Sequence, residues 1–69
     1  MNNSFKKIKD NVYQIMYTDG SSYIGPIENE NNKKRSGKNG KWTSQDGTAI
    51  YEGGYLNGLR DGFGKFALG

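Results

Sequence analysis

Five cationic side chains lie close together in the middle of the chain and are the first candidates for binding chemistry: Lys33, Lys34, Arg35, Lys38 and Lys41. Such a cluster can bind phosphate oxygens, either of acidic lipid headgroups or of a nucleic acid backbone. The acidic residues Glu28 and Glu30 precede it, and a mixture of both charges is typical of a solvated loop. We therefore interpret the cluster first as a solvated hairpin tip and keep anion binding as the alternative.

The residue types that most often carry catalysis are missing from the chain. It contains neither Cys nor His, which removes thiolate ligands, the commonest zinc ligand and the commonest general base. The carboxylates do not follow metal-ligand spacing, and the segment SGKNGK at 36–41 lacks the full spacing of a phosphate-binding P-loop. We predict no enzymatic activity, no metal, no cofactor and no small-molecule substrate.

Length and composition favour one small domain. The chain has 69 residues, a hydrophobic fraction of only 32% and a net charge of +3, which is too mildly basic to indicate nucleic acid by itself. No apolar run is long enough for a membrane span or resembles a signal peptide. We expect residues 1–11 to form a solvated N-terminal tail. We also expect an intracellular protein, in the cytoplasm or at a membrane or cytoskeletal surface.

Short strands joined by tight turns are predicted for the rest of the chain. Gly and Asn recur too often for a long helix, whereas Asp19-Gly20, Asp46-Gly47 and Asn57-Gly58 are turn signals. Aromatic and β-branched residues between the turns predict five strands, at 12–18, 21–27, 40–44, 48–56 and 62–68. The predicted fold is all-β, a single-layer antiparallel meander over 12–68, with a long basic loop at 28–39.

The chain also repeats itself. Tyr23 and Gly25 follow the first Asp-Gly turn, as Tyr51 and Gly53 follow the second. Farther along, the Gly40–Trp42 segment GKW matches Gly64–Phe66, GKF. Because these elements recur in the same order, we infer two copies of one hairpin unit, with a longer loop in the first copy.

The second copy, YEGGYLNGLRDGFGKF, resembles a MORN motif, the membrane occupation and recognition nexus repeat. The matching positions are Tyr51, Gly53, Tyr55, Asn57, Gly58, Gly62, Gly64 and Phe66. In the first copy Ile27 stands where the motif has an aromatic residue, and the loop is long. The resemblance covers about two and a half repeats and implies β-hairpins stacked into an elongated sheet.

The glycines of the motif have a predicted structural role. Residues two apart on a strand share a face, so Gly53, Gly62 and Gly64 are expected to provide bare backbone on which Tyr51, Tyr55 and Phe66 can pack. Each buried ring would contribute about 1.5–3 kcal/mol. Gly58 belongs to the turn, and Gly54 receives no role.

These features favour a non-enzymatic scaffold or interaction subunit that docks onto other proteins through its sheet and edges. An array of so few strands leaves edges that pair readily with other chains, so we expect a larger assembly or self-association. One alternative is peripheral binding of acidic phospholipid, such as phosphoinositide, through the basic loop. A small basic β-module in a ribonucleoprotein is a further alternative, with nucleic acid the less favoured partner.

Overall fold

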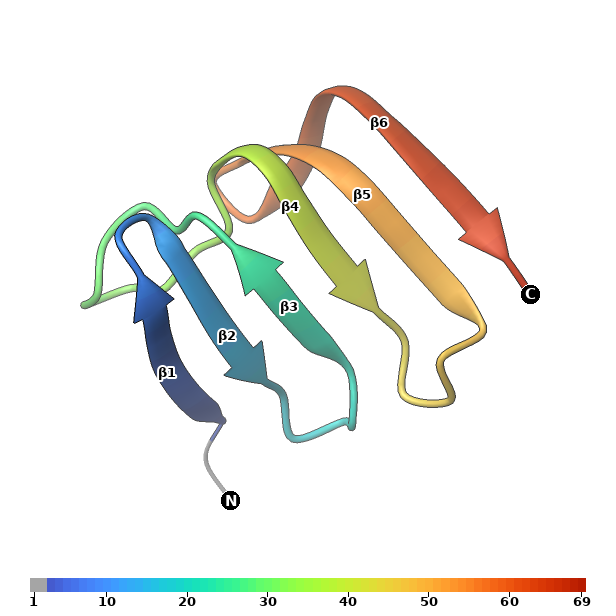
Figure 1. Cartoon of the computed structure of the whole chain (residues 1–69), viewed down its shortest axis with the longest axis horizontal. Helices are drawn as coiled ribbons and strands as arrows, with labels where there is room; N and C mark the ends of the chain where they lie inside the picture. The colour runs from blue at the N-terminus through green and yellow to red at the C-terminus, as the bar shows by residue number, and fades with distance from the viewer. Residues whose placement is uncertain (1–2) are drawn as a thin grey trace.

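The computed structural model describes residues 3 to 69, which form one open antiparallel sheet of six strands in chain order (Figure 1). The strands are β1 (Ser4–Lys9), β2 (Val12–Met16), β3 (Ser22–Gly25), β4 (Gly37–Thr43), β5 (Ala49–Leu56) and β6 (Leu59–Leu68). Within the described range no helix that could cross a membrane occurs. The predicted all-β meander is confirmed, with one strand more than expected.

The additional strand is β1, and the expectation of a tail at 1–11 is therefore wrong for this segment. Phe5 pairs with Ile15 of β2, and its ring stacks on Tyr13 with the centroids 5.5 Å apart. Asn11 adopts a φ of 62° in the tight turn between the strands. The strand was not predicted because its lysines are typical of a solvated tail. Charged side chains are, however, tolerated on a strand at the edge of a sheet. Met1 and Asn2 lie outside the described residues.

One row of large side chains crosses all six strands on the same face of the sheet. We call it the aromatic row: Phe5, Ile15, Tyr23, Trp42, Tyr51 and Phe66. A glycine lies two residues away from this row on each of the last four strands, after the aromatic residue on β3 and β5 and before it on β4 and β6. These form the glycine row: Gly25, Gly40, Gly53 and Gly64. We call this face of the sheet the inner face.

Two rings of the aromatic row, those of Tyr23 and Tyr51, lean over the glycine row. A Cβ placed on Gly40 would lie 2.5 Å from the hydroxyl oxygen of Tyr23, and one on Gly64 would collide with the ring of Tyr51. Tyr23 and Tyr51 are both buried as a result. A sheet without a second layer thus obtains a core by packing rings on its own backbone, at about 1.5–3 kcal/mol for each ring.

The hairpins β3–β4 and β5–β6 are equivalent in detail. The Tyr23 hydroxyl donates to the carbonyl of Pro26 at 2.6 Å, and the Tyr51 hydroxyl donates to that of Gly54 at 3.1 Å. The preceding turns match as well, because Asp19 and Asp46 each accept a bond from the backbone N–H two residues later. The internal repeat in the sequence therefore corresponds to a repeated structure.

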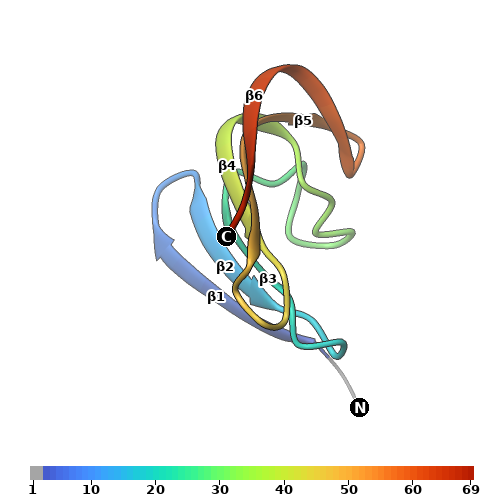
Figure 2. The same cartoon turned by 90° about the vertical axis from the view of Figure 1, so that its right-hand side faces the viewer.

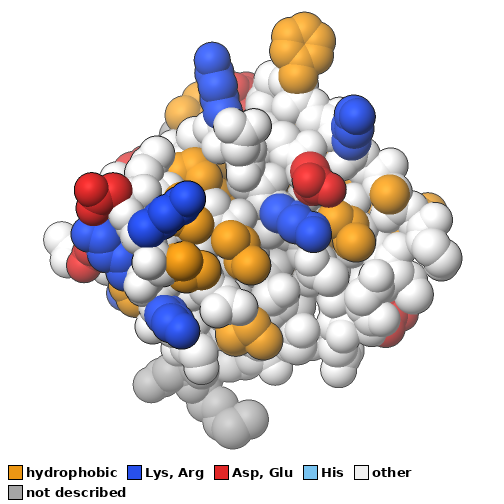
Figure 3. Space-filling model, viewed as in Figure 1, with side chains coloured by type: hydrophobic (Ala, Val, Ile, Leu, Met, Phe, Trp, Pro, Cys, Tyr) orange, Lys and Arg blue, Asp and Glu red, His pale blue; other side chains and the backbone are white. Residues whose placement is uncertain are grey.

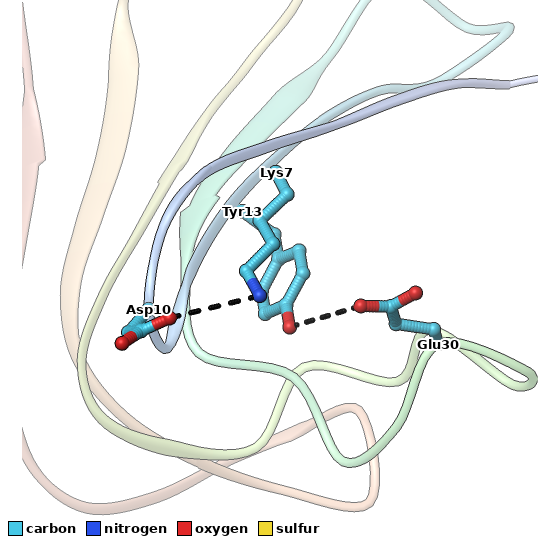
Figure 4. Close-up of polar contacts among 4 residues, drawn as sticks. All are labelled: Lys7, Asp10, Tyr13 and Glu30. Atoms are coloured by element: carbon cyan, nitrogen blue, oxygen red, sulfur yellow. Dashed lines mark hydrogen bonds and ion pairs between the residues drawn. The ribbon is translucent and has the colours of Figure 1, made fainter.

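The loop between β3 and β4 lies on the inner face of the sheet, where the end of the β5–β6 hairpin also projects (Figure 2). The side chain of Ile27 is buried, and its backbone bridges to Arg35. The Tyr13 hydroxyl donates to Glu30 at 3.2 Å (Figure 4). The loop is shorter than the predicted 28–39, because β4 begins at Gly37. A fully solvated tip is found only at 28–32.

Candidate functional site

The five cations of the sequence cluster do not assemble into one site. Lys33 lies with its Nζ 5.0 Å from the ring centroid of Phe5, whereas Arg35 packs against tyrosines on the inner face. Lys41 is on the outer face, beside Glu52 of β5. Lys34 and Lys38 are exposed. Because folding distributes these side chains over both faces, the sequence cluster is not a single anion-binding surface.

The tyrosines of the motif do come together. The ring of Tyr55 meets those of Tyr23 and Tyr51 edge to face, with centroid separations of 5.5 and 5.2 Å. This geometry is favourable for aromatic pairs. All three tyrosines are buried, which gives them the structural role that we expected.

The predicted roles of the glycines are only partly right. Gly64 lies under Tyr51, and Gly53 lies against the backbone of Gly64. Gly62 supports no ring, because nothing lies within 4 Å of the position of its Cβ; its φ of +73° explains the glycine instead. Gly58, with a φ of +82°, is in the turn as predicted. Gly54 has a role after all, since a Cβ there would collide with the carbonyl of Asp61.

Tyr55 and Phe66 do not pack on glycines, although the sequence had predicted this for them. Tyr55 packs on other rings and not on a glycine. The ring of Phe66 is 52% exposed and lies beneath the guanidinium of Arg60, with 5.5 Å between its centroid and Cζ. Phe66 therefore ends the aromatic row as a largely accessible side chain.

An open cleft of 780 Å³ is hollowed into the inner face. Aromatic rings and two arginines form half of its lining, and we call it the arginine–aromatic cleft after them: Tyr17, Arg35, Trp42, Tyr51, Tyr55, Arg60 and Phe66. Tyr17 and Arg60 were not among the candidate residues of the sequence analysis. Neither belongs to the repeated Tyr and Gly positions, so no sequence signal distinguished them from ordinary turn and strand residues.

Both arginines lie over aromatic rings. The Cζ of Arg35 is 5.1 Å from the ring centroid of Tyr55 and 5.5 Å from that of Tyr17. The Cζ of Arg60 is 5.4 Å from the ring centroid of Tyr51. These contacts are within the range of cation–π attraction, at about 0.5–2 kcal/mol each. The rings hold the guanidinium groups in the lining of the cleft.

The arginines are not neutralised by a close carboxylate. Across residues 3–69 the one ion pair within 4 Å joins Lys7 to Asp10, at 3.7 Å (Figure 4). Asp19 also lines the cleft, but its Oδ1 accepts bonds from the backbone N–H and the hydroxyl of Ser21, at 2.8 and 2.6 Å. These bonds are the main reason why the pKa of Asp19 is lowered, with a minor contribution from the charge of Arg35.

Tyr17, Tyr23 and Tyr55, beside the cleft, are protonated at neutral pH. Burial raises the pKa of Tyr17, Tyr23 and Tyr55 above the ordinary value, although the charge of Arg35 acts in the opposite direction. A neutral hydroxyl can donate a hydrogen bond but cannot serve as a base. In the described part of the chain, no three acidic, His or Cys side chains are grouped to hold a metal ion.

The outer face and the β6 edge present further exposed apolar side chains. Hydrophobic groups lie among cationic ones on the outer face (Figure 3), where Ile8, Met16 and Ile24 are exposed. On β6, Leu59 is 72% exposed and Phe63 is 99% exposed. Isolated exposed residues are common, but a run of them along an edge strand is typical of a contact surface.

Comparison with known proteins gives no family assignment. No protein-family model, no curated protein and no solved structure matches this chain.

Proposed function

We propose that the chain is a non-enzymatic interaction module of the MORN-repeat type, which docks onto other proteins through the open β6 edge of its sheet. The observation that carries this proposal is β6 itself. It is a strand of ten residues, all of them exposed, and it is paired on one side only, with β5. Its free backbone groups and exposed Leu59, Phe63 and Leu68 are what strand addition requires.

The opposite edge of the sheet is built differently. β1 carries Lys6, Lys7 and Lys9, and lysines on an edge strand disfavour pairing with another strand. β6 also has charges, Arg60, Asp61 and Lys65, but these are of both signs. Of the two edges, β6 is therefore the better surface for a partner strand.

The repeat-type assignment is supported by the hairpins. Each places a tyrosine ring over a glycine on the facing strand and closes its hydroxyl onto a carbonyl three residues later. These are the Tyr and Gly positions of the MORN-like pattern. Stacked hairpins of this kind expose long surfaces, which suits contact with proteins.

An acidic membrane surface is the second candidate, favoured by one observation. Phe63 is 99% exposed, and Lys41 and Lys65 lie in one row of the outer face, on either side of Glu52. An exposed ring beside lysines can bind at the headgroup boundary of an anionic bilayer. Flotation with vesicles that contain phosphatidylserine tests it, since binding should require Phe63 and weaken with salt.

The experiment for the leading proposal compares two variants of the full chain. Phe63→Ser with Leu68→Ser alters the β6 edge, whereas Met16→Ser with Ile24→Ser makes an equal number of changes on the outer face. We expect the proteins captured by the original chain to be lost from the edge variant and kept by the face variant, and sedimentation to show any self-association lost in parallel. Capture and sedimentation that are the same for both variants would contradict the proposal.

A further inference from the structure

The arginine–aromatic cleft contains two positive groups that are fixed in position and have no close carboxylate partner among residues 3–69. We propose that this cleft binds the acidic side chains of an extended peptide segment, with Arg35 and Arg60 as the receptors of its carboxylates. The inference rests on the proposed function in taking the ligand to be part of a partner protein. The cleft includes Leu59, Arg60 and Phe66 of β6 but neither Phe63 nor Leu68, which carry the edge test.

Arg35 is held by several independent contacts. Its backbone bridges to Ile27, and its carbonyl accepts a bond from the Gly58 N–H at 2.8 Å, which ties the long loop to the β5–β6 turn. The guanidinium lies within 6 Å of the ring centroids of three tyrosines. A side chain fixed in this way loses little conformational freedom on binding, so more of the interaction energy contributes to affinity.

Arg60 is placed by the sheet. It pairs with Tyr55 across the β5–β6 hairpin, and its guanidinium lies over the rings of Tyr51 and Phe66. Because Arg60 belongs to β6 and Arg35 to the loop, two different elements of the fold supply the cations of one cleft. A planar guanidinium can bind a carboxylate through two parallel N–H donors, so two acidic side chains of one peptide can be bound.

Size and charge agree with a peptide ligand. The cleft volume of 780 Å³ is in the range of small-molecule and peptide pockets. Asp19 lines the same cleft, but its Oδ1 is engaged by Ser21. Two cations and one anion leave the cleft positive. Carboxylates on an otherwise apolar extended segment would complement both the arginines and the aromatic walls.

Other anionic partners fit the cleft less well. Bases of a nucleic acid would stack on open ring faces, but the guanidinium groups already lie over Tyr51, Tyr55 and Phe66. A flat bilayer would meet the long loop and the β5–β6 hairpin first, because both project on the inner side of the sheet (Figure 2). A flexible chain can enter between them.

The test uses the fluorescence of Trp42, the one tryptophan of the chain, which lines the cleft. The intact protein is titrated with the capped peptide Glu-Val-Glu-Val-Glu and with its Gln-Val-Gln-Val-Gln analogue. We expect the acidic peptide to bind at least about tenfold more tightly, as charged hydrogen bonds imply, and its binding to weaken with salt. Equal affinity for the two peptides would overturn the proposal.

Variants separate the cleft from general charge. Arg60→Gln, at an exposed position, should reduce the affinity for the acidic peptide about tenfold, while Lys38→Gln makes the same charge change outside the cleft and should have little effect. Arg35→Gln is the second cleft variant, and thermal unfolding shows whether it remains folded. Equal losses for Arg60→Gln and Lys38→Gln would overturn the proposal. A second result would also overturn it: the protein binds phosphatidylserine vesicles or a single-stranded oligonucleotide but not the peptide, and Arg60→Gln abolishes that binding.

The two proposals fail separately. If the β6 edge variant loses its protein partners while the acidic peptide does not bind, the cleft inference is wrong and the edge function stands. If the peptide binds through Arg60 while the edge variant keeps every partner, the edge function is wrong and the cleft remains a peptide site.

Discussion

The ring of Tyr51 lies directly on the backbone of Gly64, across the β5–β6 hairpin, where any Cβ would collide with it. The pair explains how this sheet builds a core without a second layer. A ring that lies flat on bare backbone is covered on one side by its own sheet, and the loop and arginines cover part of the other side. The Tyr23–Gly40 pair repeats the arrangement one hairpin earlier.

Replacing Gly64 should therefore be costly. In Gly64→Ala the added methyl group must displace the Tyr51 ring, and overpacking of this kind costs about 1–3 kcal/mol. Gly62→Asn is the matched change on the same strand, because the φ of +73° suits Asn and the space around Gly62 is open. Urea unfolding should show a clear loss of stability for Gly64→Ala and little for Gly62→Asn. Similar midpoints for the two variants would argue against the ring-on-glycine core.

The sequence predicted those parts of the fold that local signals determine. The Asp-Gly turns around Asp19 and Asp46 and the repeated Tyr and Gly positions were enough for an antiparallel meander, because turn chemistry and strand alternation act over a few residues. The expected glycine support for Tyr55 was wrong, since two extra residues of β6 in the bulge opposite Gly54 place Arg60, and not Gly62, across from Tyr55.

The remaining features depend on contacts between distant residues. β1 is a strand because it pairs with β2, although its lysines gave it the composition of a tail. Arg35 looked like one member of a basic cluster, and only the fold of the loop brings it to Tyr55 and separates it from Lys41. The arginine–aromatic cleft could not be predicted. Arg60 and Tyr17 are far apart in the sequence and belong to no common motif, and only the folded sheet brings them to the same cleft.

The two equivalent tyrosine hydroxyls should differ in their contribution to stability. Tyr23→Phe removes a 2.6 Å bond to Pro26 in a buried site and leaves that carbonyl with only the longer bond from the Ser36 N–H, at 3.3 Å. This should cost about 1–1.5 kcal/mol, the upper part of the range for one hydrogen bond. Tyr51→Phe removes a longer bond of 3.1 Å in a partly buried site and should cost about 0.5–1.5 kcal/mol. Each variant keeps its ring on the glycine, so chemical unfolding isolates the hydroxyl. A larger loss for Tyr51→Phe than for Tyr23→Phe would contradict this order.

Tyr55 and Phe66 both occupy positions of the MORN-like motif, but truncating the two side chains should lower the stability of the fold by different amounts. Tyr55 is 6% exposed and packs on two rings, so truncation in Tyr55→Ala should cost about 3 kcal/mol or more. Phe66 is 52% exposed, and Phe66→Ala should cost about 1 kcal/mol, in proportion to the area it buries. A domain of this size has a stability of only about 3–5 kcal/mol.

Circular dichroism and thermal unfolding check the difference. We expect Tyr55→Ala to be largely unfolded at room temperature and Phe66→Ala to remain folded with a lowered midpoint. If Phe66→Ala unfolds while Tyr55→Ala keeps its structure, the assignment of the core to the three buried tyrosines is wrong.

Stability should fall in acid through the Asp46 turn. The Oδ1 of Asp46 accepts bonds from the backbone N–H of Thr48, from its hydroxyl and from that of Ser44, and these bonds lower the pKa of Asp46 from 3.8 to about 2. A lowered pKa in the folded state means that this stabilisation is complete above pH 3.8 and is lost as the pH falls through 3.8 to about 2. Thermal midpoints measured across that range should decrease. The decrease should be smaller in Thr48→Ala, which keeps the backbone donor and the Ser44 hydroxyl, and smallest in Asp46→Asn with Asp19→Asn. An acid dependence that is unchanged in the double variant would show that other groups control it.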